Sequence, residues 1–288
     1  MRLATRFGTR RSIDARTSFL SEDQIQAAIP AVFAGEAHAS RSDRYTFLST
    51  IDLLRGLASE GFRPTFAGQA IPRKEDRLGT TKHMLRFRRE GETFGAGEAG
   101  EIVMVNSHGG ESGFQIFAGV FRFICMNGMV CGDTFKEVRV RHSGNVLADV
   151  VTGTLSMVKN FDRLQNDVAA MKSLPLSRGE QDAFAESAMM LRFDSHEDGT
   201  VKTPLQPAQI LAPKRSADTA GDLWTTFNVV QEHLVRGGDT AFTRDANNRR
   251  RRVTSRAVEG IDGNVKLNRA LWNLAERMAE LKGERLAA

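Results

Sequence analysis

Residues 83–142, HMLRFRREGETFGAGEAGEIVMVNSHGGESGFQIFAGVFRFICMNGMVCGDTFKEVRVRH, decide the fold that the sequence predicts. Apolar and polar residues alternate, or form short apolar runs, in four segments of this stretch: 83–89, 101–108, 113–132 and 135–142. The third segment is one long strand or two strands broken at Gly119, and Asn127-Gly128 is a strong signal for a hairpin turn. The stretch therefore predicts four or five adjacent antiparallel strands.

Helical periodicity dominates the flanking sequence. A 3.6-residue period appears at 49–59 and again from Asn145 to about residue 172. Further helices are predicted at 24–33, with an interruption at Pro30, and at 180–191, 222–235 and 265–281. An antiparallel meander sheet at about residues 83–142, packed with helices before and after it and followed by a helical C-terminal half, is an α+β fold.

Composition divides the chain into four expected parts. Residues 1–20 form a basic N-terminal arm, and residues 21–192 form an α+β core domain. Residues 193–219 contain several prolines and a polar stretch, which predicts a linker or surface loop. Residues 220–288 form a C-terminal helical segment that packs on the core.

The overall composition excludes several classes of protein. The chain has 288 residues, of which 26% are charged and 41% hydrophobic, so it is globular rather than disordered. No apolar run is long enough for a membrane-spanning helix, and the arginine-rich start lacks the apolar segment of a secretory signal. Two cysteines, Cys125 and Cys131, do not make a disulfide scaffold. We expect a cytoplasmic protein with no membrane partner.

Arginine is concentrated in three regions. The formal net charge is +5, and the basic residues gather at 1–16, 62–89 and 244–256. Arginine suits phosphate oxygens because its guanidinium donates two parallel hydrogen bonds. Solvated surface loops are the alternative interpretation of each cluster. Three clusters together favour a nucleic-acid partner.

Alternation along the strands places several arginines on common faces of the sheet. Arg86 and Arg88 share a face of the strand at 83–89, and Arg139 and Arg141 share a face of the strand at 135–142. If those faces coincide, four arginines stand on one side of the sheet as phosphate contacts.

Two further groups complete the predicted nucleic-acid site. Phe121 and Phe123 share a strand face and are candidates for stacking on bases, although phenylalanine in a sheet is more often part of the core. Between the last two helices we expect a flexible basic clamp formed by Arg249, Arg250, Arg251 and Arg252. Arginine beside an aromatic ring is the combination that holds single-stranded nucleic acid.

Other chemistries receive little support. Histidines and cysteines in the sheet region do not have the spacing of a zinc site, so we expect no metal. Gly95 to Gly100 imitate a dinucleotide fingerprint, but a strand follows where a helix is needed, so we expect no cofactor. No catalytic motif is present, which favours a protein without enzymatic activity. His142, near a predicted helix N-terminus, is a candidate ligand or phosphate contact.

Two motifs in the decisive stretch resemble a known family. Phe121 to Val130, FRFICMNGMV, and Val138 to Asn145, VRVRHSGN, are similar to the R-x-x-C-x-N-G and R-x-x-H-[ST]-G core of phage- and plasmid-like proteins that contain a domain of unknown function. DLWTTFN at 222–228 resembles a later segment of that family. Asn127 is a motif candidate on this basis. The resemblance implies work on mobile DNA or against host defences, and it brings no catalytic residues.

These observations predict a non-enzymatic nucleic-acid-binding protein of a phage- or plasmid-type mobile element, with single-stranded DNA binding or annealing as the favoured activity. Annealing proteins of mobile elements combine an antiparallel sheet, a long helix and a basic groove, and assemble as homo-oligomers; this likeness is one of architecture alone. One alternative is an interaction module that inhibits a host defence or replication protein. A second alternative is an enzyme acting on nucleic acid.

Overall fold

The computed structural model divides the chain into two compact units, residues 1–162 with 259–262, and residues 163–258 with 263–288. The structure describes the following residues: 11–15, 18–41, 45, 47–72, 74–94, 97–124, 127–131, 138–140, 150, 152–154, 156, 158–159 and 161–283. The α+β fold class is confirmed.

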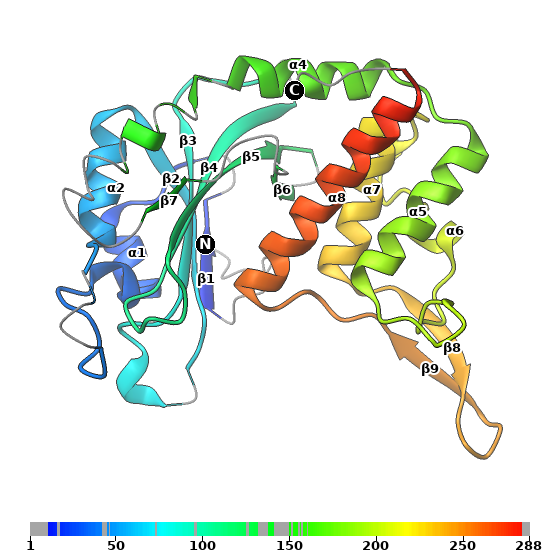
Figure 1. The fold of residues 1–288 in the computed structure, drawn as a ribbon, viewed down its shortest axis with the longest axis horizontal. Helices are drawn as coiled ribbons and strands as arrows, with labels where there is room; N and C mark the ends of the chain where they lie inside the picture. The colour runs from blue at the N-terminus through cyan, green and yellow to red at the C-terminus, as the bar shows by residue number, and fades with distance from the viewer. Residues whose placement is uncertain are drawn as a thin grey trace. The chain divides into compact units, whose positions relative to one another are not determined.

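The first unit is built on an antiparallel sheet (Figure 1). Its strands pair in the order β1-β2-β3-β4-β5-β6, and β7 pairs with β5 beside the Phe114 end of that strand. The strands are β1 (Arg11–Asp14), β2 (Phe62–Gln69), β3 (His83–Arg89), β4 (Glu98–Asn106), β5 (Phe114–Arg122), β6 (Asn127–Val130) and β7 (Val138–Val140). Every pairing is antiparallel, so the predicted meander is confirmed.

Several predicted strand boundaries are wrong. Of the two alternatives for 113–132, the break at Gly119 is not found, because β5 runs through this glycine, which is paired with Glu101 on one side and Val130 on the other, but the strand ends at Arg122. Asn127-Gly128 lies inside β6 instead of forming the turn, and Asn127 pairs with Arg122. β4 begins at Glu98, within the expected glycine-rich loop. Of the strand expected at 135–142, the part that the structure describes is 138–140.

Two strands of this sheet were not predicted at all. β1 lies in the segment expected to be a basic arm, where Ile13 pairs with Ala67 and is 1% exposed. β2 contains Pro64, which obscures its pattern because proline removes a donor from the ladder. The ladder shifts register between Pro64 and Phe66, so the proline sits at a bulge.

Helices α1 (Glu22–Ala28) and α2 (Thr50–Ser59) lie on one side of the sheet (Figure 1). α1 begins with a capping box between Ser21 and Gln24, and the Ser49 hydroxyl accepts a hydrogen bond from the Asp52 N–H at the start of α2. A 3-10 turn at Pro30–Phe33 follows α1, where the interruption was expected. The apolar faces of both helices are buried and form the core of this unit with the sheet.

The second unit is mainly helical. Its elements are α4 (Phe161–Ser173), α5 (Arg178–Arg192), α6 (Pro207–Ile210), α7 (Leu223–Arg236), β8 (Thr240–Arg244), β9 (Arg250–Thr254) and α8 (Ile261–Leu281), of which α4 and α8 each begin with two residues that belong to the first unit. α7 is buried along nearly its whole length, and its Trp224 and Phe227 pack against Trp272 of α8. The helices expected at 180–191, 222–235 and 265–281 are confirmed.

The middle of the chain departs from the expected boundaries. In the region of the helix predicted from Asn145 to about residue 172, the described residues are helical at 150, 152–154, 156 and 158, Lys159 lies in a turn, and α4 follows from Phe161. Residues 193–219 contain α6 and a 3-10 turn at Ser216–Asp218, and they belong to the second compact unit. The division between units falls at residue 162.

Gly119 gives a test of the continuous β5 strand. A Cβ atom at this position would lie 2.6 Å from the Met129 carbonyl oxygen and 3.0 Å from Val103 Cγ2. We expect Gly119→Val to lower the free energy of unfolding by about 1–3 kcal/mol, the usual cost of overpacking. A Cβ atom at Gly113 would meet no atom within 4 Å, so Gly113→Val is the matched control. Equal urea midpoints for the two variants would contradict the close packing.

Candidate functional site

The two sheet arginines expected to contact phosphate lie in the interior of the first unit. Arg86 and Arg88 share a face of β3, and they are 2% and 5% exposed. Arg86 Nη1 lies 3.3 Å from Glu101 Oε2, and Arg88 Nε lies 3.4 Å from Glu101 Oε1. Arg86 Nη2 also donates to the Met129 carbonyl at 2.8 Å. Both guanidinium groups are thus engaged inside the protein.

Burial perturbs the ionisation of this cluster. It lowers the pKa of Arg86 and of Arg88 and raises the pKa of Glu101, while the attraction between the opposite charges acts against each shift. Asp14 of β1 adds negative charge near both arginines. Because arginine keeps its proton in proteins, the two positive charges persist and the carboxylates must balance them.

The two phenylalanines predicted as stacking residues lie beside this cluster. Arg88 Cζ is 4.3 Å from the ring centroid of Phe121 and 5.2 Å from that of Phe123. The rings meet edge to face, with centroids 5.3 Å apart. Phe121 is 4% exposed, so its ring packs on a buried guanidinium.

The other predicted site residues of the sheet are only partly described. Arg139 lies in β7 opposite Gln115, and Asn127 opens β6. The side chains of Arg139 and Asn127, and all of Arg141, His142 and Cys125, lie outside the described residues.

The arginine cluster at 244–256 lies on a β-hairpin formed by β8 and β9, in the segment where a flexible basic clamp is expected from the sequence. Figure 1 shows β8 and β9 as a two-stranded hairpin that extends from the helices of its own unit. The Asp245 carboxylate closes the turn by accepting hydrogen bonds from the backbone N–H groups of Asn247 and Arg249, both at 2.9 Å. Asn248 adopts φ 60°, a conformation that asparagine tolerates better than most residues.

Strand pairing gives the hairpin two different faces. Phe242 pairs with Arg252, and Arg244 pairs with Arg250, so alternation puts these four residues on one face. We call Phe242, Arg244, Arg250 and Arg252 the arginine face. All four are exposed, and Arg250 Cζ lies 3.6 Å from the centroid of the Phe242 ring. Arg251 pairs with Thr243 on the opposite face.

The base of the hairpin is fixed to α7. His233 Nδ1 lies 2.6 Å from Asp239 Oδ1, and His233 Nε2 lies 2.9 Å from the Ala212 carbonyl oxygen. The Asp239 N–H donates to the Ser255 hydroxyl at 3.0 Å, which joins the start of β8 to the end of β9. Gly237 has φ 62°, and a Cβ there would meet the Arg256 backbone at 2.6 Å. These hydrogen bonds therefore hold the end of the hairpin that is next to α7 in a defined position.

A polar cluster without access to solvent lies in the first unit. Thr50 Oγ1 is 2.8 Å from His83 Nε2 and 3.2 Å from His108 Nε2, and it accepts a hydrogen bond from Asn106 Nδ2 at 2.9 Å. Because the Thr81 carbonyl can only accept, His83 carries its proton on Nδ1, so the Thr50 hydroxyl donates to His83 Nε2. Burial lowers the pKa of His83 to about 4. Through their contacts with Thr50, these histidines stabilise the N-terminal end of α2.

The described part of the chain offers neither a metal site nor a membrane span. Within the described residues, no three histidine, cysteine or acidic side chains are grouped so that they could hold a metal ion. The Cys131 side chain is buried. Among the described helices, none combines the length and the apolar character needed to cross a bilayer.

Sequence reasoning missed Phe242, the aromatic member of the arginine face. The signal was present, because TAFTR and RRRVT are short strand-like segments separated by Asp-Ala-Asn-Asn-Arg, which contains the turn residues Asp245, Asn247 and Asn248.

The two units define an α+β protein with a cluster of exposed arginines on a hairpin of the helical unit. The chain belongs to the family described as "Domain of unknown function (DUF932)", whose model matches residues 37–272. It is 44% identical over 277 residues to the UPF0380 protein YafZ of Escherichia coli (strain K12), covering 96% of this chain and 97% of that protein. The UPF0380 protein YfjQ of the same strain matches with the same identity and coverage. No solved structure matches. The expected membership of a family with a domain of unknown function is confirmed.

Glu101 provides a test of the buried ionic cluster. Glu101→Gln leaves two buried guanidinium groups without their carboxylate, and we expect the free energy of unfolding to fall by about 3–5 kcal/mol. Glu92 pairs with Arg89 at the surface, where it is about half exposed, so Glu92→Gln should cost less than about 1 kcal/mol. Urea unfolding of both variants measures the difference. Similar losses in the two would contradict the assigned role of Glu101.

His83 gives a pH prediction. Its pKa is about 4 in the folded chain against 6.5 for the free side chain, so between these values the unfolded state binds more protons. His83 therefore lowers the free energy of unfolding as the pH falls from 6.5 towards 4, by up to about 3 kcal/mol. In His83→Gln this titration is absent. The difference in free energy of unfolding between wild type and variant should therefore become smaller as the pH falls from 6.5 towards 4. If this difference in free energy of unfolding does not change with pH, His83 does not titrate in this way.

Proposed function

We propose that this protein binds nucleic acid without covalent chemistry, and that the β8–β9 hairpin is the binding element. The observation that carries the proposal is the arginine face, where three arginines and an exposed phenylalanine share one side of a hairpin with a defined turn and base. The proposal keeps Arg249 and Arg251 as flanking phosphate contacts. It does not use Arg86 or Arg88, whose charges are engaged inside the sheet.

The charge of the hairpin supports this proposal. Residues 240–256 contain six arginines and a single acidic residue, Asp245, whose carboxylate is engaged in the turn. In the described part of the chain, no carboxylate lies within ion-pair distance of Arg249 to Arg252. Arginines that are not neutralised by the protein attract phosphate and release counterions when a nucleic acid binds.

The aromatic member of the arginine face supports a single-stranded ligand. Phe242 is 51% exposed, and the planar guanidinium of Arg250 lies over its ring. A base that is free of its partner strand stacks on such a ring or on the guanidinium plane, whereas a paired base is already stacked. A two-stranded hairpin also fits the major groove of duplex DNA, so a preference for duplex is the competing outcome.

The finer parts of the proposal concern the biological setting. We propose strand binding or annealing in the cytoplasm, on behalf of a phage- or plasmid-type element, with assembly into homo-oligomers. The alternative of an interaction module that inhibits a host protein predicts one tight protein partner and only weak DNA binding. An enzyme acting on nucleic acid would change the strand itself, which gel analysis of the bound strand would reveal.

The test is fluorescence anisotropy with a labelled single strand and a duplex of equal length, titrated at several salt concentrations. We expect sub-micromolar binding of the single strand, tighter than non-specific binding of about 10⁻⁴–10⁻⁶ M. The triple variant Arg244→Gln, Arg250→Gln, Arg252→Gln should weaken binding and reduce the salt slope by about 2, since each contact to a single strand contributes about 0.7.

The matched control removes the same charge elsewhere. Arg55, Arg178 and Arg277 are more than half exposed, and their replacement by glutamine should leave the salt slope nearly unchanged. Equal slopes for the two triple variants would remove the hairpin from the proposal. Wild-type binding no tighter than the non-specific range would overturn the proposed function.

A further inference from the structure

A cavity of about 360 Å³ lies at the base of the hairpin, within the second unit. The face of the hairpin opposite the arginine face forms one wall, with Ala241, Thr243 and Val253. The end of α5 and the segment 202–205 form the other walls. The volume falls within the range of pockets that take small ligands, about 300–1,000 Å³.

Local hydrogen bonds hold these walls in place. α5 ends at Arg192, and Phe193 follows it in an extended conformation. The chain then makes a short turn in which Ser195 pairs with Val201, and it returns along the cavity. Gln209 Nε2 of α6 donates to the Thr240 carbonyl of β8 at 3.0 Å, which ties the returning segment to the hairpin. These contacts therefore fix the walls of the cavity relative to one another.

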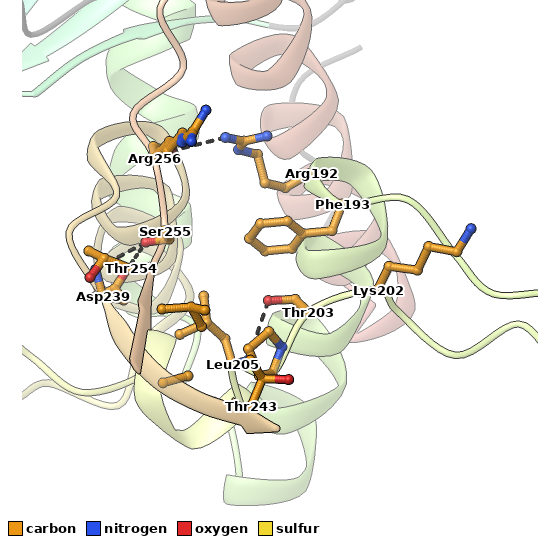
Figure 2. A pocket seen from close by; sticks show the side chains of 13 residues that line it. Arg192, Phe193, Lys202, Thr203, Leu205, Asp239, Thr243, Thr254, Ser255 and Arg256 are labelled. Carbon is orange, nitrogen blue, oxygen red and sulfur yellow. Dashed lines mark hydrogen bonds between the residues drawn. The ribbon is translucent and has the colours of Figure 1, made fainter. Parts of the chain in front are cut away.

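The two ends of the cavity differ in polarity (Figure 2). Arg192 and Arg256 lie at one end, Leu205 and Thr243 lie at the other, and the ring of Phe193 lies between them. The carbonyls of Leu234 and Arg256 accept hydrogen bonds from Arg192 at 3.2 and 3.1 Å, which fixes its guanidinium. A ligand that fits is anionic at one end and flat and apolar at the other.

The acidic residue that lines the cavity does not neutralise these arginines. Asp239 lies 2.6 Å from His233 and 3.4 Å from the Ser255 hydroxyl. Its carboxylate is therefore engaged at the base of the hairpin, and the lining as a whole keeps an excess of positive charge through Arg192, Lys202 and Arg256.

We propose that this pocket binds a single nucleotide, with the base against Phe193 and the phosphate at Arg192 and Arg256. This inference rests on the proposed function and deepens it, because it assigns a nucleotide-sized site to the same hairpin. The nucleotide has two sources: an unpaired residue of a strand that the arginine face holds, or a free nucleoside monophosphate.

The first arm of the test uses strands. We compare the affinity of a DNA single strand with that of an abasic strand of equal length, for wild type, Phe193→Leu and Ala241→Leu. Phe193→Leu removes the ring, and Ala241→Leu fills the cavity from the strand side and leaves the arginine face intact. We expect both variants to lose roughly 5- to 150-fold in affinity for the DNA strand, the range of one base stack, and to bind the abasic strand as wild type does. Two independent variants guard against a folding defect in either.

The second arm uses small ligands, with adenosine monophosphate and inorganic phosphate titrated by calorimetry. We expect the monophosphate to bind more tightly than phosphate, and Phe193→Leu to abolish that difference. Equal binding of the two ligands, together with unchanged strand affinity in both variants, would overturn the pocket and leave the proposed function standing. Monophosphate binding that depends on Phe193, without any strand binding, would support the pocket and overturn the proposed function.

Discussion

Glu101 holds the positive charge of two arginines inside the sheet of the first unit, and the arrangement of that sheet depends on it. Alternation places Arg86 and Arg88 on one face of β3. The Glu101 carboxylate of β4 lies 3.3 Å from Arg86 Nη1 and 3.4 Å from Arg88 Nε. Without it, two desolvated guanidinium groups would oppose the pairing of β3 with β4. The ion pairs with Glu101 therefore allow β3, which carries two buried arginines, to lie in the interior of the sheet.

The protein thus has two populations of arginine with different physical roles. Those in β3 balance a carboxylate, Arg88 packs against Phe121, and burial lowers the pKa of both. Those of the hairpin are exposed, and the nearby Asp245 is engaged by the backbone of the turn. A binding surface for a polyanion needs the second kind, because only exposed and uncompensated charge is free to exchange counterions for phosphate. For this reason we propose that the nucleic-acid-binding site lies on the β8–β9 hairpin and not on the sheet.

Much of the fold could be predicted because its signals are local. The α+β class, the strand at 83–89 and the helices at 180–191, 222–235 and 265–281 follow from periodicity and capping residues. The break considered at Gly119 and the failure to predict β2, which contains Pro64, share one cause. Gly119 and Pro64 carry strand-breaking propensity, yet tertiary pairing outweighs it, since the ladder of β5 continues through the glycine and β2 accommodates the proline at a bulge.

The charged residues and the strand faces that they share follow from the sequence alone, because the two-residue period of a strand is a property of the backbone. Only the tertiary structure decided what each arginine meets. Glu101 is far from Arg86 in sequence and reaches it through the pairing of β3 with β4. Phe242 and Arg250 come together through a turn, and the cavity behind them requires α5, the segment 202–205 and both strands. Such contacts depend on which elements pack together, and residue pattern alone does not specify that.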